Sequence, residues 1–186
     1  MPGDTLRRLE LDNGEGSCVI HGDSKTNAIS TIGVQDRKIH EGCYFFRRSF
    51  VNITGTGKSY FLLQTPEAPT TVHTYFDASV DGDFNIKVYE GGTISSTGTP
   101  LPVFNANRSS SKTPSASLYA DAGITATGTL FWESSLNTTI FTSAQVGEFA
   151  YEIVLKPDED YILEVTHNDT GTDVLNYNLH FYEVNC

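Results

Sequence analysis

Hydrophobic and polar residues alternate along much of the chain after residue 40, and a period of two predicts β-strands. The clearest runs cover residues 71–79, 84–89, 149–155, 161–165 and 175–181, where apolar side chains recur at every second position. Such strands place one row of side chains in a core and the other row toward solvent. No segment shows the longer periodicity of a helix of more than two turns.

Turn residues separate these runs, notably Asp81-Gly82-Asp83 and Pro157-Asp158-Glu159-Asp160. We expect about nine short strands at spacings of about 8–14 residues, which is typical of an antiparallel sandwich or barrel. Residues 43–53 and 59–64 flank a glycine-rich turn and predict a hairpin. The long polar loops 91–101 and 107–117 favour a jelly-roll or Greek-key topology over a meander.

The first 38 residues lack sustained alternation. Leu9 and Leu11 predict one short strand, and residues 18–20 predict another. We interpret residues 1–38 as an extended N-terminal arm whose order depends on a partner. The expected fold is therefore all-β, an antiparallel, jelly-roll-like β-sandwich over residues 39–186 that follows this arm.

Composition and charge narrow the possible functions. Of 186 residues, 38% are hydrophobic, 11% aromatic and 19% charged, which excludes a disordered chain or a helical bundle. Residues 1–58 hold 8 Lys/Arg and 7 Asp/Glu, whereas residues 59–186 hold 4 and 16. This acidic excess disfavours nucleic acid and anionic membranes as partners. It either keeps the protein soluble or faces solvent while the near-neutral first third docks on an acidic neighbour.

The chain has three cysteines, Cys18, Cys43 and Cys186, and no apolar stretch near its first residues. The odd count, without a secretory signal, predicts synthesis in a reducing cytosol. We expect Cys43 to be a structural thiol and Cys186 to be free. No Cys-x-x-Cys pair supports a zinc site.

Motifs for catalysis or cofactor binding are weak. Residues 55–59, Gly-Thr-Gly-Lys-Ser, end like a phosphate-binding loop, but Asn52 stands where that loop needs glycine and a β-like segment follows. There is no nucleophile elbow, and the five histidines are scattered. We therefore predict no enzyme, no catalytic residue and no cofactor. The acidic turns 81–83 and 158–160 are explained by backbone hydrogen bonding, with a bound calcium ion as the alternative.

Aromatic residues leave two interpretations open. Trp132, Tyr75, Tyr119 and Tyr151 either stack on a sugar or fill the core and its cross-strand pairs. The four Asn-x-Ser/Thr triplets, which begin at residues 52, 107, 137 and 168, indicate no glycan in a chain without a secretory signal.

Five local motifs, in this order, resemble a known group of proteins: Ile39-His40-Glu41-Gly42, Val88-Tyr89-Glu90-Gly91, Asn105-Ala106-Asn107-Arg108, Leu155-Lys156-Pro157 with Tyr161, and Phe181-Tyr182-Glu183. The group is the auxiliary capsid proteins of tailed bacteriophages, also called decoration or cement proteins. The resemblance covers about residues 39–183. It implies a sandwich or jelly-roll module that binds the outside of an assembled shell, often as a homotrimer.

The leading hypothesis is thus a structural virion protein on the outer capsid surface, made in the host cytoplasm, with the major capsid protein as its partner. Residues 1–42 would add to that partner or drape over it, with strand addition as one way of binding. Candidate interface residues are Leu6, Arg7, Arg8, Leu9, Ile39, His40, Glu41, Asn107 and Arg108.

Two of these motifs also have local interpretations. We expect His40-Glu41-Gly42 to be the turn that leads from the arm into the sandwich. Arg108 would order the loop 109–114 or pair with an acid of a neighbouring subunit. The alternative function is a carbohydrate- or receptor-binding module of a phage tail or fibre, for which a ligand groove with an exposed Trp132 or exposed tyrosines would count. A hydrolase on a sandwich scaffold is a third possibility and needs a cleft with convergent acids.

Overall fold

A computed structural model describes residues 9–12, 17–22, 29–30, 33–137, 145–148 and 152–186. The chain divides into two compact units, Met1–Arg37 and Lys38–Cys186. In the first unit, the strands β1 (Leu9–Asp12), β2 (Ser17–Gly22) and β3 (Ile29–Ser30) form a small antiparallel sheet in that order. Both short strands expected before residue 38 are therefore present.

One short helix, α1 (Val34–Glu41), precedes the first long strand. It ends at Gly42, whose φ of 74° lies in the left-handed region. The N–H of Gly42 donates to the carbonyl of Ile39 at 3.0 Å, and the N–H of Cys43 donates to the carbonyl of Lys38 at 2.9 Å. This is the Schellman termination of a helix. The turn predicted over residues 40–42 is thus wrong for His40 and Glu41, because a helix this short and polar carries no apolar period.

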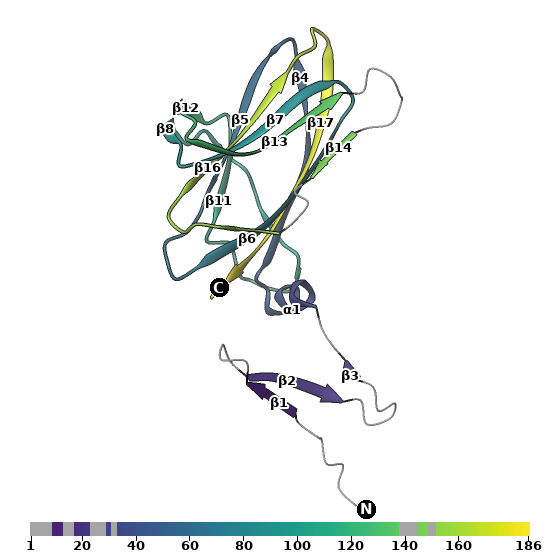
Figure 1. The fold of residues 1–186 in the computed structure, drawn as a ribbon, viewed down its shortest axis with the longest axis vertical. Helices are drawn as coiled ribbons and strands as arrows, with labels where there is room; N and C mark the ends of the chain where they lie inside the picture. Colours follow the sequence, from purple (N-terminus) through teal and green to yellow (C-terminus); the bar gives the residue numbers. More distant parts are fainter. Residues whose placement is uncertain (1–8, 13–16, 23–28, 31–32, 138–144, 149–151) are drawn as a thin grey trace, which may run out of the picture. The chain divides into compact units, whose positions relative to one another are not determined.

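The second unit is an antiparallel β-sandwich of two six-stranded sheets (Figure 1). The β4 sheet has the order β10-β4-β17-β6-β14, with β15 also paired to β6. Its strands are β4 (Tyr44–Thr54), β6 (Thr71–Val80), β10 (Phe104–Asn105), β14 (Gln145–Glu148), β15 (Ile153–Leu155) and β17 (Thr172–Val184). The predicted all-β, jelly-roll-like sandwich is confirmed.

The β5 sheet has the order β13-β7-β16-β5-β11-β9. Its strands are β5 (Gly57–Gln64), β7 (Asp83–Glu90), β9 (Thr99–Pro100), β11 (Ser117–Ala120), β13 (Thr129–Asn137) and β16 (Asp160–His167). A two-stranded sheet of β8 (Thr93–Ser96) and β12 (Gly123–Ala126) is separate from both. The predicted loop over residues 91–101 therefore contains two strands, β8 and β9.

Several consecutive strands lie in opposite sheets, which corrects the predicted hairpin. β4 pairs with β10 and β17, whereas β5 pairs with β11 and β16. The turn between β4 and β5, at Gly55, therefore carries the chain from one layer to the other. The same holds for β6 and β7, for β15 and β16, and for β16 and β17, so Pro157 does not set a hairpin either. Alternation shows which residues face a core, but not which strand lies alongside.

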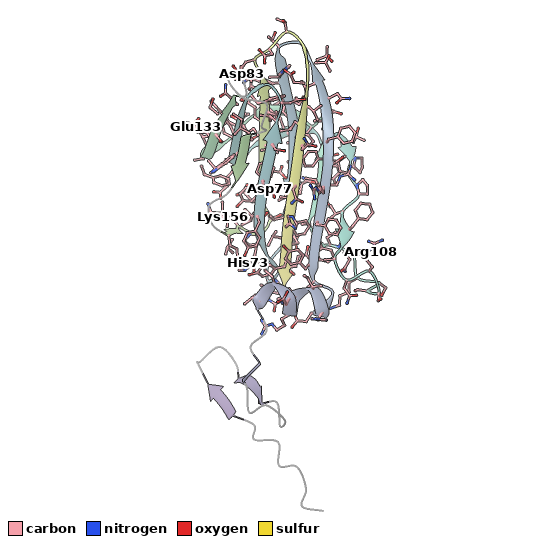
Figure 2. The ribbon with its side chains drawn as sticks, turned by 90° about the vertical axis from the view of Figure 1, so that its right-hand side faces the viewer. His73, Asp77, Asp83, Arg108, Glu133 and Lys156 are labelled. Carbon is pink, nitrogen blue, oxygen red and sulfur yellow. A yellow bond between two sulfur atoms is a disulfide. The ribbon has the colours of Figure 1, made fainter. Side chains whose placement is uncertain are left out.

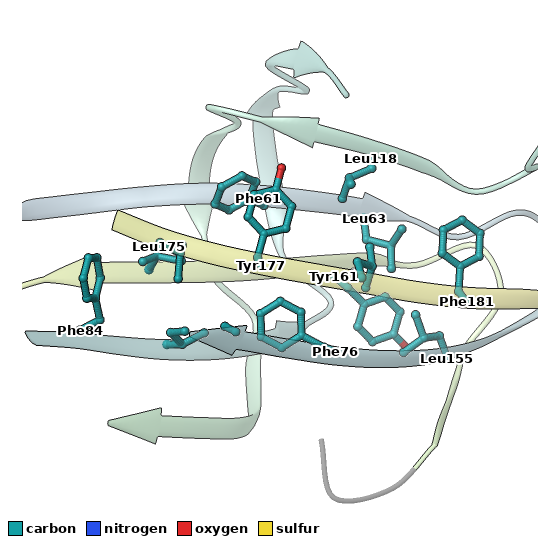
Figure 3. Close-up of a cluster of buried hydrophobic side chains, with 14 of the residues drawn as sticks. Phe61, Leu63, Phe76, Phe84, Leu118, Leu155, Tyr161, Leu175, Tyr177 and Phe181 are labelled. Carbon is teal, nitrogen blue, oxygen red and sulfur yellow. The ribbon is translucent and has the colours of Figure 1, made fainter. Parts of the chain in front are cut away.

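The core lies between the two sheets (Figure 3). In β6 and β7, buried and partly exposed residues alternate, as their periodicity predicts. Figure 3 shows aromatic and aliphatic side chains from both layers filling this space, among them Phe61, Phe76, Tyr177 and Phe181. A second, smaller cluster, formed by Leu62, Ala122 and Ile162, is buried on the other side of the β5 sheet.

The described cysteines of the sandwich form a disulfide between Cys43 and Cys186, with Cα atoms 6.0 Å apart. The expectation of a thiol at Cys43 and a free Cys186 is therefore wrong. The cause is the register of β4 and β17, which are antiparallel and pair Tyr44 with Tyr182. The start of one strand thus meets the end of the other, and one sequence alone does not show that register. Cys18 lies in β2, outside this pair.

Candidate functional site

The candidate interface residues fall into three places. Leu6, Arg7 and Arg8 lie outside the described residues. Leu9 begins β1 and pairs with Ile20 of β2. The others lie in α1 or in the loop after β10; these are Ile39, His40, Glu41, Asn107 and Arg108.

The structure brings the α1 end and the loop after β10 together through two asparagines. The amide of Asn107 donates to the carbonyl of His40 at 3.3 Å, and the amide of Asn105 donates to the carbonyl of Gly42 at 2.8 Å. The side-chain oxygen of Asn107 also accepts the N–H of Ser109 at 3.1 Å. Asn107 therefore orders this loop, a role that the sequence analysis offered to Arg108.

Other resemblance motifs also meet inside the sandwich. The Lys156 ammonium pairs with a carboxylate oxygen of Glu90, and the Tyr161 hydroxyl donates to the other oxygen at 2.9 Å. The Lys156 hydrogen bond is the main cause that lowers the pKa of Glu90. The carboxylate of Glu183, fully buried, accepts the backbone N–H groups of Ser115 and Ala116. These motif residues hold strands and loops to one another.

A row of rings crosses the outer face of the β4 sheet, the face turned away from the core. Contacts run from Phe104 to Phe46 at 6.1 Å and from Phe46 to His180 at 6.4 Å, measured between ring centroids. Tyr44 lies 6.0 Å from His180 and 6.4 Å from Tyr182. Burial is the first cause that lowers the pKa of His180, so a neutral imidazole is favoured within this aromatic row.

The row ends at the carboxylate of Glu152, just before β15, which is hydrogen-bonded by side chains of β6 and β17. Glu152 accepts hydrogen bonds from Tyr75, from Tyr182 at 2.6 Å and from His73. His73 also stacks on Tyr182, with ring centroids 4.6 Å apart. Burial raises the pKa of Glu152, but the three hydrogen bonds and the His73 charge outweigh it and leave the pKa lowered. This end of the row is satisfied internally.

At the other end of the row, the β4 strand has an open edge. β10 pairs with β4 only at Phe45 and Phe46, and no other described strand pairs with β4 on that side. The carbonyl of Tyr44 accepts the N–H of Ala106 from this side at 2.9 Å. Since backbone groups alternate along a strand, those of residues 48, 50 and 52 point to the same side. They have no partner strand among the described residues.

Side chains along this edge are exposed, and they include two aromatic rings and two arginines. Phe50 is 65% exposed and Phe104 is 40% exposed. The Arg108 guanidinium lies 5.6 Å from the centre of the Phe104 ring, as in a cation–π contact. Figure 2 shows Arg108 at the border of the sandwich opposite Glu133 and Lys156. Phe46, Phe50 and Phe104 were not predicted from the sequence, although the even positions of Phe46 and Phe50 in the aromatic segment that forms β4 were a usable signal.

Arg48 and Arg108 have no carboxylate partner among the described residues. The four lysines at 38, 58, 87 and 156 each pair with an acid instead, at Glu41, Glu164, Glu133 and Glu90 respectively. Arg47 donates to neutral acceptors, the carbonyl of Pro102 at 3.3 Å and the hydroxyl of Ser49 at 3.4 Å. We call Arg48, Phe50, Asn52, Phe104 and Arg108, with the open backbone of β4, the edge surface.

At one end of the sandwich, the acidic turn 81–83 bonds to residues 169 and 174. Asp81 accepts the N–H of Val174, and Asp169 accepts the N–H of Asp83 at 3.0 Å. The buried imidazole of His167 bonds to Asp173 and to the carbonyl of Gly55, both at 2.8 Å. Ligand atoms of His167, Asp169 and Asp173 lie within 4.8 Å of one another, so these three could hold a cation. Turn chemistry accounts for the same contacts.

The proposed sugar-stacking aromatics do not gather on one surface. Trp132 is partly buried and packs edge-on against Phe76, with centroids 6.1 Å apart. Tyr75 lies on the outer face of the β4 sheet, and Tyr119 packs beside the small cluster on the β5 sheet. Tyr151 lies outside the described residues.

No family model, curated protein or solved structure matches this chain. The single helix within the described residues is not long and apolar enough to cross a bilayer.

Proposed function

We propose that this protein is a structural virion protein that binds the outer surface of a bacteriophage capsid and stabilises the shell. The partner would be the major capsid protein, and three copies would assemble on it. The proposal combines the ordered motifs of the sequence with the surface chemistry of the sandwich. It has no reaction to explain, because adhesion alone would be the function.

The edge surface is the observation that carries this proposal. A rigid sandwich with internally bonded loops presents one border that is left exposed, aromatic and positively charged. Exposed apolar residues together with arginine are typical of protein–protein contacts. Residues 59–186 are otherwise strongly acidic, so this border differs from most of the surface around it.

Shell stabilisation would follow from mass action. A protein that binds only the assembled lattice raises the stability of that lattice, by about 2.7 kcal/mol per site when its concentration is 100 times Kd. A trimer that spans several capsid subunits would bind more tightly still, through its effective concentration.

The direct test mixes the purified chain with purified, expanded shells of a candidate tailed phage. We expect co-sedimentation at a fixed number of copies per shell and a higher melting temperature of the shell. A variant without residues 1–38 separates the contribution of the N-terminal unit from that of the sandwich. If the full chain neither sediments with shells nor shifts their melting, the proposed function is wrong.

The carbohydrate-binding alternative loses its main support in the structure. A ligand groove with an exposed Trp132 or exposed tyrosines would have counted for it, and the Trp132 ring is partly buried against the core instead.

A further inference from the structure

We propose that the open edge of β4 binds an extended acidic segment of the partner protein as an added β-strand. This deepens the proposed function, on which the identity of the partner rests, but the edge itself is a property of the isolated chain. Strand addition of this kind takes its affinity from main-chain hydrogen bonds and its specificity from side chains at alternate positions.

The backbone of β4 is suited to accept a strand. β4 spans Tyr44–Thr54, and its pairing with β17 is continuous from Tyr44 to Thr54. The β4 residues after Phe46, up to Thr54, include no proline or glycine, and no bulge interrupts this register. Natural edges are usually shortened, bulged or covered, whereas the edge over residues 48–52 is none of these within the described part of the chain.

The positive charges along the edge indicate that the bound segment is acidic. Arg48 lies on the exposed edge strand, and Arg108 lies over Phe104, whose strand pairs with β4 at Phe46. Neither arginine has an acidic partner among the described residues, although the lysines of the sandwich each find one or lie beside the disulfide. Acidic side chains on an added strand would supply carboxylate partners for these two guanidinium groups.

Apolar contact adds to this selection. Phe50 is the most exposed large hydrophobic side chain of the described residues, and its own backbone points to the open edge. Arg48 and Phe50 lie two positions apart on the same face of β4. An added strand would therefore place an acid near Arg48 and an apolar residue near Phe50 at two successive positions of that one face.

A second copy of this chain fits less well. An isologous contact between two β4 edges would bring the same positively charged patch of each copy together. Like charges across paired strands are destabilising. The charge pattern therefore favours an acidic partner segment over self-pairing.

The first test measures amide hydrogen exchange of the full-length free chain. The N–H groups of Arg48, Phe50 and Asn52 should exchange at least ~100-fold faster than those of Arg47, Ser49 and Val51, which point to β17. Equal protection of both sets at low concentration would show that the chain covers its own edge. Protection that grows with protein concentration would indicate a second copy. Either result overturns the proposal.

The second test uses synthetic probes and needs no shell. In one eight-residue peptide every second residue is threonine, and the residues between them are alternately glutamate and valine, so that both types share one face. In the other peptide lysine replaces glutamate. Fluorescence anisotropy at low salt should show binding of the glutamate peptide only, with protection of the three edge amides. The double variant Arg48→Glu/Arg108→Glu should weaken that binding by about tenfold or more. Asn52→Pro removes one outward N–H without touching the β17 ladder and should also weaken it.

The matched control is Lys87→Glu/Lys156→Glu, which changes net charge equally on the opposite border. It should bind the peptide about as well as the wild type after the general charge effect is removed by added salt. Thermal melting confirms that each variant folds. Equal binding of both peptides, or equal loss in the control, overturns strand addition. Shell binding that persists in both edge variants would leave the capsid function standing and reject only this inference.

Discussion

The outer faces of the two sheets are built differently. The outer face of the β5 sheet has its own apolar cluster, in which Leu62 and Ile162 are fully buried against residues of β8 and β12. Charged groups there are paired, as in Lys58 with Glu164. The outer face of the β4 sheet leaves Phe50 exposed and Arg48 without an acid. The outer face of the β5 sheet thus buries an apolar cluster of its own, whereas the β4 sheet exposes the residues to which we assign partner binding.

The largest expected effect on stability comes from a substitution on the outer face of the β5 sheet, which β8 and β12 cover. We call it the covered face. Leu62→Ala should lower the free energy of unfolding by about 2–5 kcal/mol, because it empties space under the β8–β12 layer. Phe50→Ala, on the open face, should change it by no more than ~0.5 kcal/mol. Urea unfolding of both variants measures the contrast. Comparable losses would show that the two faces do not differ in this way.

A smaller effect is expected at the buried carboxylate of the covered face. Glu164 is buried and accepts hydrogen bonds from Lys58 at 3.0 Å and from Tyr60 at 3.1 Å. Lys58→Met leaves this charge with one donor and should cost about 1–3 kcal/mol of stability. Lys87→Met, beside the exposed Glu133, should cost about 0–1 kcal/mol. The same unfolding assay applies, and an equal cost at both sites would remove the distinction.

Two histidines should respond to pH with opposite signs. Burial lowers the pKa of His167, but its hydrogen bonds to Asp173 and Gly55 and the nearby acids outweigh this and raise it. Its contribution to stability is therefore full below about pH 6.5, the ordinary value, and is lost as pH rises through the raised pKa. His180 has a lowered pKa, because of burial and the charge of Arg48. Its contribution is present above about pH 6.5 and is lost as pH falls through the lowered pKa.

Comparison of the wild type with His167→Gln and with His180→Gln, unfolded between pH 5 and 9, measures these contributions. The difference in the free energy of unfolding between the wild type and His167→Gln should shrink as pH rises. The corresponding difference for His180→Gln should grow. Parallel pH profiles would contradict the assigned environments. The pH range is chosen to bracket the ordinary histidine pKa of about 6.5.

The sequence predicted the fold class well, because alternation in β6, β7 and β17 reports directly which residues face a core. It did not predict which strands pair with one another. The sequences of β4 and β5, for example, look like a hairpin, and yet these strands lie in different sheets. It also missed α1, whose eight residues carry too few apolar positions to show a helical period, and β8, whose four residues include a single apolar one, Ile94.

The candidate site was predicted only in part. Asn107 and His40 were chosen from sequence, and the structure joins them, but as a loop contact. The edge surface depends on which strand borders a sheet and on which acids lie near which arginines. Both are consequences of long-range pairing, which local patterns do not encode.

The bond between Cys43 and Cys186 makes the sandwich covalently circular, with 143 residues of sequence separation between its two ends. A single protease cut in any loop of this ring would leave the two pieces tethered until a reductant is added. A pull on the chain before residue 43 would reach the ring at one point, where β4 and β17 are fastened together. The disulfide would therefore keep β4 and β17 together when force is applied through the segment before residue 43.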